Sequence, residues 1–352
     1  MHLFARAGVT DVQAAARLVP VIDFAPAFAG VPGALRAVGA ELRRACEEVG
    51  FFYVAGHGVA AAVIERGFAA SRSFHALPLP TRLALRLNEN NIGYLPMNAS
   101  TQAASTVHKA TRPNQNESFF ISYDRDAAHP DVIAATPLRG RNQWPPGVTS
   151  MRADMMEYFH ALEALGRRML PGFAVALDLE ADYFAPFFAG EAHATLRFLH
   201  YPPQRDTADN SFGTAPHTDN SFMTLLARTD VPGLAIRMPS GEWFAPPVIA
   251  GTFLVNLGNI MRRWSNERFL STPHGVINDS GADRYSIACF FSPRPDTVIA
   301  PLPSCVDAAH PPRSEPALYQ DLILAFFRAN YFHQPGHRSE AAAHATAAAP
   351  GA

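Results

Sequence analysis

PHTDNSFMTLLA at residues 216–227 and STPHGV at residues 271–276 contain the residues that decide how this chain folds and what it can bind. His217 and Asp219 are separated by one residue, so on a strand, or at its end, both side chains leave the same face. His274 follows far enough along the chain to come from a different strand. Two imidazoles and one carboxylate are the ligands of a facial triad, which leaves one side of an iron(II) ion open for chemistry. This pattern predicts a metal centre.

Arg284 and Ser286 follow the second histidine and occupy alternate positions of an expected strand. The alternation within RYSIACFF (residues 284–291) predicts that Arg284 faces the interior, where a buried cation needs an anionic partner. A guanidinium–carboxylate contact supported by a hydroxyl group is the strongest such partner. The pair is therefore predicted to hold a small-molecule carboxylate near the metal.

From about residue 193 the sequence changes to short β-like runs that are separated by turn signals such as VPG and NDSGAD. The runs are TLRFLHY (195–201), SFMTLLA (221–227), LAIRM (234–238), TFLVNLG (252–258), HGVIN (274–278) and YSIACFFSP (285–293). Regularly spaced short strands are typical of a sandwich or barrel, and a jelly roll is the natural candidate.

The chain before these strands has a mainly helical pattern. Apolar residues recur at helical spacing over residues 34–49 and 148–178, which predicts two amphipathic helices. The other expected elements are strands at residues 18–24 and 50–59, helices at residues 60–76 and 80–87, and a closing helix at residues 315–332.

The predicted fold class is mixed α+β, with a double-stranded β-helix (jelly-roll) core at residues 151–335. Residues 1–150 are expected to form a helical and mixed region that lines the pocket and does not fold independently. Residues 336–352 are alanine-rich and of low complexity, so a disordered tail is predicted there.

Composition excludes several other classes of protein. The 352 residues are 48% hydrophobic, carry a net charge of −2 and contain no basic run, which argues against nucleic-acid binding. No apolar stretch reaches the roughly 18 residues of a membrane span. The three cysteines form no C-x-x-C pair, so neither a disulfide framework nor a zinc ribbon is expected, and a reducing cytoplasm fits. A monomer is the expected state.

Seven segments, taken in order, resemble one known family. They are GFFYVAGHGV (50–59), LRFLHYPP (196–203), PHTDNSFMTLL (216–226), GLAIRM (233–238), FLVNLGN (253–259), RWSNERFLSTPHGV (263–276) and RYSIACFFSP (284–293). Their order is similar to that in the isopenicillin N synthase-like iron(II) dioxygenases, and the resemblance runs from about residue 18 to residue 330. It implies a jelly-roll core that carries the metal. It also implies dioxygen and, in most members, 2-oxoglutarate as co-substrates.

The resemblance assigns roles to individual positions. His217, Asp219 and His274 match the iron ligands and thus the catalytic residues. Arg284 and Ser286 match the R-x-S pair that binds the distal carboxylate of 2-oxoglutarate. Tyr201 stands where members often place a tyrosine that contacts this co-substrate.

Two positions depart from the common pattern of the family. Leu199 stands two residues before Tyr201, where plant members commonly carry Asn. Asn259 stands where many relatives have Asp, and a structural role is expected for it.

Residues that select the substrate are expected in the loop-rich stretch 88–125, which mixes polar and aromatic side chains as a pocket rim does. The candidate contacts are Asn114, Glu117 and Phe119. One of the two phenylalanines that follow the Arg-x-Ser pair is also expected to face the pocket, and Phe291 is the candidate. The predicted reaction is hydroxylation, desaturation or cyclisation of a small organic substrate, with release of succinate and carbon dioxide.

Three alternatives stay open at this point. A 2-oxoglutarate-independent iron oxidase of the same fold would bind the carboxylate of its own substrate at Arg284 and Ser286. A zinc hydrolase would use the same two histidines and one carboxylate. A non-enzymatic jelly roll would only bind a small ligand.

Overall fold

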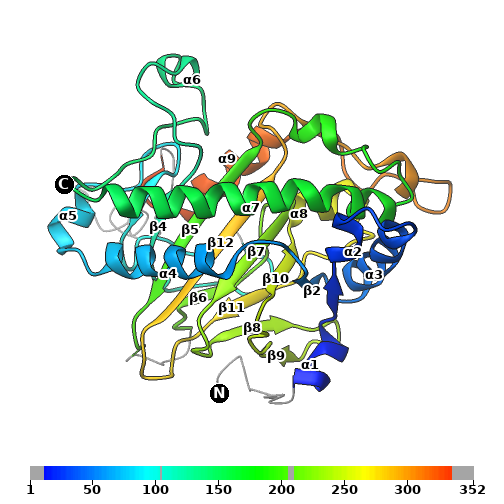
Figure 1. Cartoon of the computed structure of the whole chain (residues 1–352), viewed down its shortest axis with the longest axis horizontal. Coiled ribbons are helices and arrows are strands. Elements are labelled where there is room, and N and C mark those ends of the chain that lie inside the picture. Colours follow the sequence, from blue (N-terminus) through cyan, green and yellow to red (C-terminus); the bar gives the residue numbers. More distant parts are fainter. Residues whose placement is uncertain (1–11, 104, 205–209, 335–352) are drawn as a thin grey trace, which may run out of the picture.

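The computed structural model describes residues 12–103, 105–204 and 210–334, which form two main β-sheets with helices packed around them (Figure 1). The mixed α+β jelly-roll architecture predicted from the sequence is confirmed. The predicted tail at residues 336–352 lies outside the described residues.

The larger sheet contains eight strands in the order β1-β2-β10-β7-β12-β5-β4-β3, and the smaller sheet contains four strands in the order β6-β11-β8-β9. The larger sheet comprises β1 (Val21–Asp23), β2 (Phe51–Ala55), β3 (Gly93–Leu95), β4 (Glu117–Ile121), β5 (His193–Tyr201), β7 (Met223–Arg228), β10 (Phe253–Leu257) and β12 (Arg284–Ser292). The smaller sheet comprises β6 (Thr214–His217), β8 (Leu234–Arg237), β9 (Trp243–Phe244) and β11 (His274–Val276), and a separate pair is formed by β13 (Val298–Ile299) and β14 (Ala317–Leu318).

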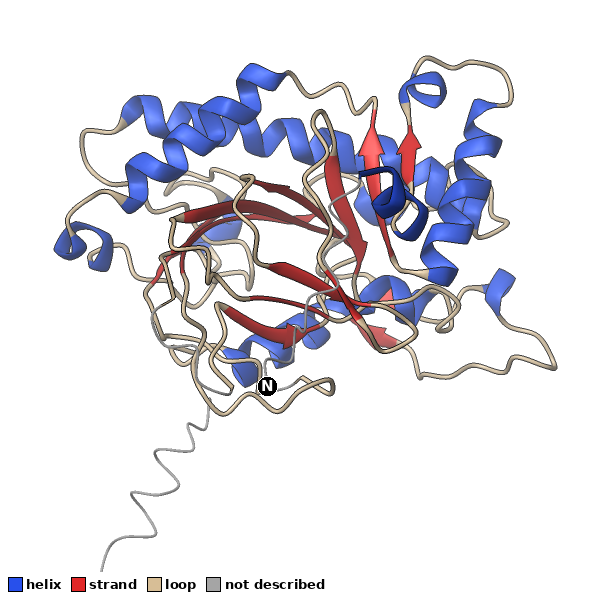
Figure 2. Cartoon of the chain, turned by 90° about the horizontal axis from the view of Figure 1, so that it is seen from below, coloured by secondary structure: helices blue, strands red, loops and turns tan. Residues whose placement is uncertain are grey.

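Two long helices cover one face of the larger sheet. The longer one, α7 (Thr149–Ala176), crosses the view of Figure 1 beside α4 (Ala61–His75), and Figure 2 shows the long helices along one side of the strands. The other helices are α1 (Val12–Leu18), α2 (Ala25–Phe28), α3 (Ala34–Glu48), α5 (Leu79–Leu83), α6 (Pro130–Ile133), α8 (Asn259–Trp264) and α9 (Tyr319–Asn330), with 3₁₀ turns η1 (Ala185–Phe188) and η2 (Pro303–Cys305). None of the described helices combines the length and the apolar character that crossing a bilayer requires.

The two faces of the larger sheet have different environments, because side chains alternate along each strand. On β12, Ile287, Cys289 and Phe291 are fully buried in the apolar core that α7 shares. Arg284 and Ser286 occupy alternate positions and therefore point to the opposite face, into the interior beneath the smaller sheet. The helix-covered face thus supplies the apolar burial, and the inner face is left for polar chemistry.

The helices expected from apolar spacing are all present, within a few residues at each end. Residues 34–49 contain α3, residues 60–76 contain α4, and residues 148–178 contain α7. The stretch 88–125 is different, because it contains β3 and the fully buried strand β4 where a loop was expected. Four strands from residues 1–150 therefore pair into the larger sheet with strands of the core.

The prediction that Phe291 contacts the substrate does not agree with its position. Its ring stacks on that of Phe188, with ring centroids 4.9 Å apart. A Cβ atom added to Gly166 of α7 would lie only 2.9 Å from the Phe291 ring. Phe291 therefore fills the contact between the sheet and α7, and its neighbour Phe290 faces the interior.

Replacement of Phe291 by Ala is expected to lower the free energy of unfolding by about 3–5 kcal/mol, the usual cost of emptying a buried aromatic site. Denaturant unfolding measures this loss, and Phe290→Ala is the matched control. An F291A protein of unchanged stability would contradict this placement of the ring.

Candidate metal centre and active site

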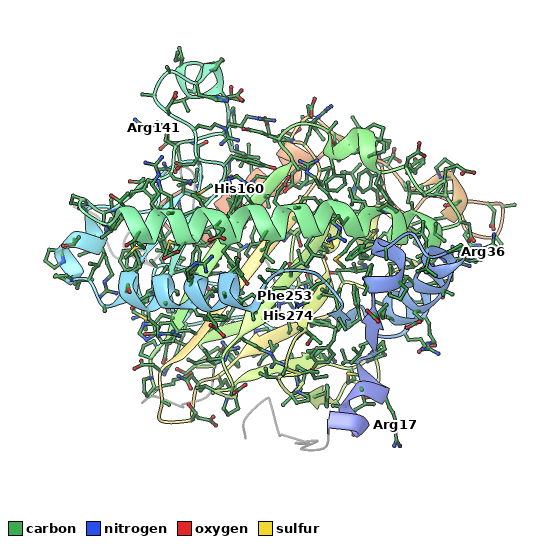
Figure 3. All side chains as sticks on the ribbon, viewed as in Figure 1. Arg17, Arg36, Arg141, His160, Phe253 and His274 are labelled. Atoms are coloured by element: carbon green, nitrogen blue, oxygen red, sulfur yellow. The ribbon has the colours of Figure 1, made fainter. Side chains whose placement is uncertain are left out.

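The three predicted ligands come together at one end of the smaller sheet. His217 is the last residue of β6, Asp219 lies just beyond it, and His274 begins β11 directly opposite His217. Asp219 Oδ1 lies 3.6 Å from His217 Nε2 and 3.8 Å from His274 Nε2. The candidate ligand atoms of the three residues all lie within 4.8 Å of one another, close enough to converge on one metal ion. Figure 3 shows His274 among the strands, near the middle of the molecule.

Backbone carbonyl groups orient both imidazole rings. His217 Nδ1 lies 2.8 Å from the carbonyl oxygen of Ala215, and His274 Nδ1 lies 3.1 Å from that of Thr272. A carbonyl oxygen can only accept, so each Nδ1 donates to its carbonyl group, and each Nε2 is the ring nitrogen turned toward Asp219. Metal-binding histidines are commonly fixed by this arrangement.

The second oxygen of Asp219 is fully engaged. Oδ2 accepts hydrogen bonds from Thr224 Oγ1 at 2.6 Å and from Asn256 Nδ2 at 2.7 Å. Burial alone would raise the pKa of Asp219, but the neighbouring imidazoles and the Asn256 hydrogen bond outweigh it and hold the pKa well below its usual range. The carboxylate is thus ionised and aimed, with Oδ1 free to bind a cation.

A tight turn holds Asp219 in place from behind. The Asn259 backbone N–H donates to the Asp219 carbonyl at 2.7 Å, and the Asn259 side chain donates to Thr218 Oγ1 and Asn220 Oδ1 at 3.1 Å each. Gly258 permits this approach, because a Cβ atom there would lie 2.1 Å from the Ser221 carbonyl oxygen. The structural role expected for Asn259 agrees with these contacts.

Thr224 and Asn256 were not recognised from the sequence. Both are polar residues within otherwise apolar strands, FMTLL and FLVNL, and that interruption is the signal that could have identified them. A polar side chain in a buried strand needs a partner, and here the partner is the predicted metal ligand.

Arg284 is a buried cation with no countercharge among the described residues. It is 1% exposed, and its Nε and Nη1 atoms have no hydrogen-bond partner in that part of the chain. Its guanidinium carbon lies 4.9 Å from the centre of the Tyr201 ring. Burial lowers the pKa of Arg284, and the neighbouring Tyr201 opposes this change. Unpaired donors on a buried cation are costly, so this arrangement is suited to an anionic ligand.

The residues predicted to clamp the carboxylate do lie together. Tyr201 pairs directly with Arg284 across β5 and β12, and Ser286 follows on the same face of β12. The Tyr201 hydroxyl is 3.2 Å from Thr214 Oγ1 on β6, so this tyrosine also bridges the two sheets. The Arg284 guanidinium and the Tyr201 hydroxyl therefore lie between the two sheets, beneath the smaller sheet that carries His217 and His274.

Two predicted substrate contacts lie on the other face of the sheet. The Glu117 carboxylate accepts hydrogen bonds from Arg82, Tyr94 and His200 beneath the helical layer. Phe119 stacks on Phe74 of α4 with centroids 4.0 Å apart. Both side chains are committed to packing between the sheet and the helices, so the structure does not bring them to the metal.

Asn114, the third predicted substrate contact, holds the strand β6 in place instead of facing the cavity. Its Oδ1 accepts from the Ala215 backbone N–H at 2.9 Å, and its Nδ2 donates to Ser100 Oγ. These bonds anchor β6 two residues before His217. The side chain is not among those that line the cavity at the metal ligands.

A cavity opens at His217 and Asp219 and encloses about 660 Å³ when its mouth is included. Its wall combines aromatic and polar side chains, with residues from β5, β12, the loop near residue 90 and α9. The other lining residues are Asn90, Asn91, Gln102, Phe120, His193, Thr195, Arg197, Asn220, Ser221, Phe290, Ser292, Tyr319, Ile323, Phe326, Phe327 and Tyr331. A concave wall that combines aromatic side chains with a few polar groups suits a small organic molecule.

Comparison with known proteins agrees with this geometry. Residues 19–147 match the family model described as "non-haem dioxygenase in morphine synthesis N-terminal", and residues 192–293 match the "2OG-Fe(II) oxygenase superfamily". The 2-oxoglutarate-Fe(II) type oxidoreductase hxnY of Emericella nidulans is 36% identical over 337 residues, which cover 93% of this chain and 95% of the relative. The chain belongs to the 2-oxoglutarate–Fe(II) oxygenase superfamily. It is an oxidoreductase that uses iron(II), 2-oxoglutarate and dioxygen and acts on a small-molecule substrate.

Other similar proteins cover the same span. Kihadalactone A synthase of Citrus sinensis is 33% identical over 298 residues, covering 82% of this chain and 87% of the relative. A putative 2OG-Fe(II) oxygenase family protein from Caulobacter crescentus has a solved structure with a TM-score of 0.75 at 25% identity, covering 88% of this chain and 98% of the other. The dioxygenase for auxin oxidation in rice has a solved structure with a TM-score of 0.66 at 26% identity, covering 87% of this chain and 93% of the other.

These relatives do not favour the alternatives that the sequence left open. Enzymes named as 2-oxoglutarate-dependent support the use of 2-oxoglutarate over an oxidase that dispenses with it. A zinc hydrolase or a non-enzymatic ligand-binding jelly roll is not favoured either.

Removal of the hydrogen bond from Asn256 is expected to weaken metal binding. An Asn256→Ala protein should bind iron(II) about 10- to 100-fold more weakly, the usual effect of losing a partner that orients a metal ligand. Anaerobic metal titration measures this change, and thermal unfolding of the metal-free protein controls for loss of fold. Unchanged iron affinity in a folded N256A protein would contradict the orienting role.

Proposed function

We propose that His217, Asp219 and His274 hold the iron(II) of this oxygenase and that Arg284, Ser286 and Tyr201 hold the distal carboxylate of 2-oxoglutarate. The observation that carries this proposal is the buried guanidinium of Arg284, whose Nε and Nη1 are unpartnered among the described residues and which lies between the two sheets, beneath the smaller sheet that carries His217 and His274. Two histidines and a carboxylate are the donor set of non-haem iron(II) oxygenases.

When bound, iron(II) with 2-oxoglutarate and dioxygen supplies an oxidant that can attack an unactivated C–H bond, while 2-oxoglutarate is converted to succinate and carbon dioxide. The protein residues determine where this chemistry happens. Asp219 and the two imidazoles would hold the ion, and the contacts of Thr224 and Asn256 keep the carboxylate from rotating. Three protein ligands would leave the remaining positions of the ion to the co-substrates.

The carboxylate clamp would orient 2-oxoglutarate as well as increase its affinity for the protein. Arg284 can donate two parallel hydrogen bonds to one carboxylate, and Ser286 can add a third from the same strand face. With its distal end held in this way, 2-oxoglutarate would extend its keto-acid end toward the ligands. The aromatic side chains in the adjoining cavity, such as Phe290 and Phe120, would shield the reacting atoms from water.

The reaction on the prime substrate is hydroxylation in this proposal, with desaturation or cyclisation as variants on the same site. We further propose a monomer acting in the reducing cytoplasm. Cys46 and Cys289 are buried free thiols and Cys305 is a partly exposed one, which is typical of proteins from such a compartment.

Arg284→Met tests the clamp. In zinc-loaded protein, which cannot turn over, 2-oxoglutarate affinity is expected to fall at least about 30-fold, because loss of a buried charge pair costs about 2 kcal/mol or more. Ser286→Ala is expected to cost roughly 2- to 10-fold, the range for one hydrogen bond. Isothermal titration calorimetry measures both.

Zinc affinity should stay unchanged in both variants, which separates the clamp from the metal ligands. Equal 2-oxoglutarate affinity in the wild-type and R284M proteins would show that the co-substrate is held elsewhere.

A further inference from the structure

A second buried arginine lines the cavity beside the metal ligands. Arg197 lies in the middle of β5, is 7% exposed, and contributes to the same wall as His217 and Asp219. It is separate from the clamp at Arg284. Arg197 pairs with Ala288 of β12 and Tyr201 pairs with Arg284, so four strand residues, about 13 Å, separate the two pairs.

The contacts of Arg197 are all with neutral groups. Nε donates to Ser118 Oγ at 2.9 Å and Nη2 donates to Asn116 Oδ1 at 3.0 Å, while the guanidinium lies over the Phe120 ring at 5.0 Å. Among the described residues no carboxylate forms an ion pair with it, and none is a hydrogen-bond partner of its Nη1. These contacts fix the guanidinium in position but leave its charge uncompensated.

The described residues of the cavity wall include no carboxylate that could provide the missing charge. Asp219 is the one acidic residue among them, and Thr224, Asn256 and the two imidazoles already engage that side chain. A buried cation that faces a cavity without an acid is stabilised by an anion that enters from outside.

Tyr331 supplies a hydroxyl group to the same wall. Its side chain is 7% exposed, and its hydroxyl makes no hydrogen bond to another described residue. The Tyr331 ring packs edge-on against Phe120, with ring centroids 6.3 Å apart, and Phe120 is the ring over which the Arg197 guanidinium lies. Burial raises the pKa of Tyr331. At neutral pH the hydroxyl is therefore a proton donor.

The wall also has an apolar part, made up of Phe120, Phe290, Ile323, Phe326 and Phe327. Such a surface suits a hydrocarbon or aromatic ring, and the lining residues offer a cationic amine no free carboxylate as a countercharge.

We propose that Arg197, with Tyr331, binds a carboxylate group of the prime substrate, and that this substrate is a small carboxylic acid with an apolar or aromatic body. This inference rests on the proposed function and assigns the substrate class of that site. One carboxylate clamp would then serve the co-substrate at Arg284, and a second would position the prime substrate at Arg197.

The test uses zinc-loaded protein saturated with 2-oxoglutarate, so that the clamp at Arg284 is filled and no turnover occurs. The probes are benzoate, phenylacetate and 3-phenylpropionate, each paired with its primary amide, and ligand-observed NMR measures their affinities. At least one acid is expected to bind about 10- to 100-fold more tightly than its amide, the ratio that one charge-assisted contact supplies.

Arg197→Gln is expected to remove this preference for the acid while leaving the affinity for 2-oxoglutarate unchanged. Arg197→Lys should retain part of the preference, because it keeps the charge but loses the fork geometry. Arg152→Gln removes the same charge from an exposed ion pair with Asp124, outside the cavity, and should change neither affinity.

Acids and amides of equal affinity, a panel in which no acid binds, or an acid preference that survives in R197Q would each overturn the proposal. Failure of the proposed function has a different signature, because 2-oxoglutarate would then fail to bind to the wild-type protein. The acid preference is read independently of that result, by comparison of the wild-type and R197Q proteins.

Discussion

The structure depends on how one carboxylate is held. Asp219 follows the end of β6, and its two oxygens have different partners: Oδ2 is fixed by Thr224 and Asn256, whereas Oδ1 faces the two imidazoles. The strand β7 carries Thr224 and the strand β10 carries Asn256, so the larger sheet aims a ligand that extends from the smaller one. The proposed metal centre is therefore one of the points where polar contacts join the two sheets of the jelly roll.

The inner face of the larger sheet carries several buried arginine side chains, which is unusual for a protein interior. Arg284 and Arg197 are both buried without a carboxylate partner in the described part of the chain, and burial lowers the pKa of the neighbouring Arg228 to about 10. Unpaired buried cations lower stability. The helix-covered face offsets this cost, because α4 and α7 bury a continuous apolar layer there. The fold thus separates the face that stabilises the protein from the face that binds anions.

Much of this could be predicted from the sequence, and the omissions have physical reasons. The H-x-D part of the triad and the Arg-x-Ser pair could be predicted because side chains alternate between the two faces of a strand, so residues i and i+2 share a face. The same rule explains the error at Phe291. Adjacent phenylalanines on a strand must face opposite ways, but the sequence does not show which face carries the helices.

The strand β4 was expected to be a loop because polar residues surround it in the sequence. Glu117 and Phe119 were assigned to the pocket as a consequence. The residues of α9 that line the cavity, and the position of Arg197 beside them, depend on contacts between segments that are distant in the sequence. Local sequence patterns do not predict such contacts.

The central claim is that one interior holds an iron ion on His217, Asp219 and His274 together with a 2-oxoglutarate molecule. The most direct measurement is anaerobic titration of iron(II) and then 2-oxoglutarate into metal-free protein, followed by the weak visible absorption of the iron–2-oxoglutarate chelate. The account predicts a band that saturates at one iron and one 2-oxoglutarate per chain and is absent from a His217→Ala protein. Binding of iron without the band, or a band that persists in H217A, would contradict it.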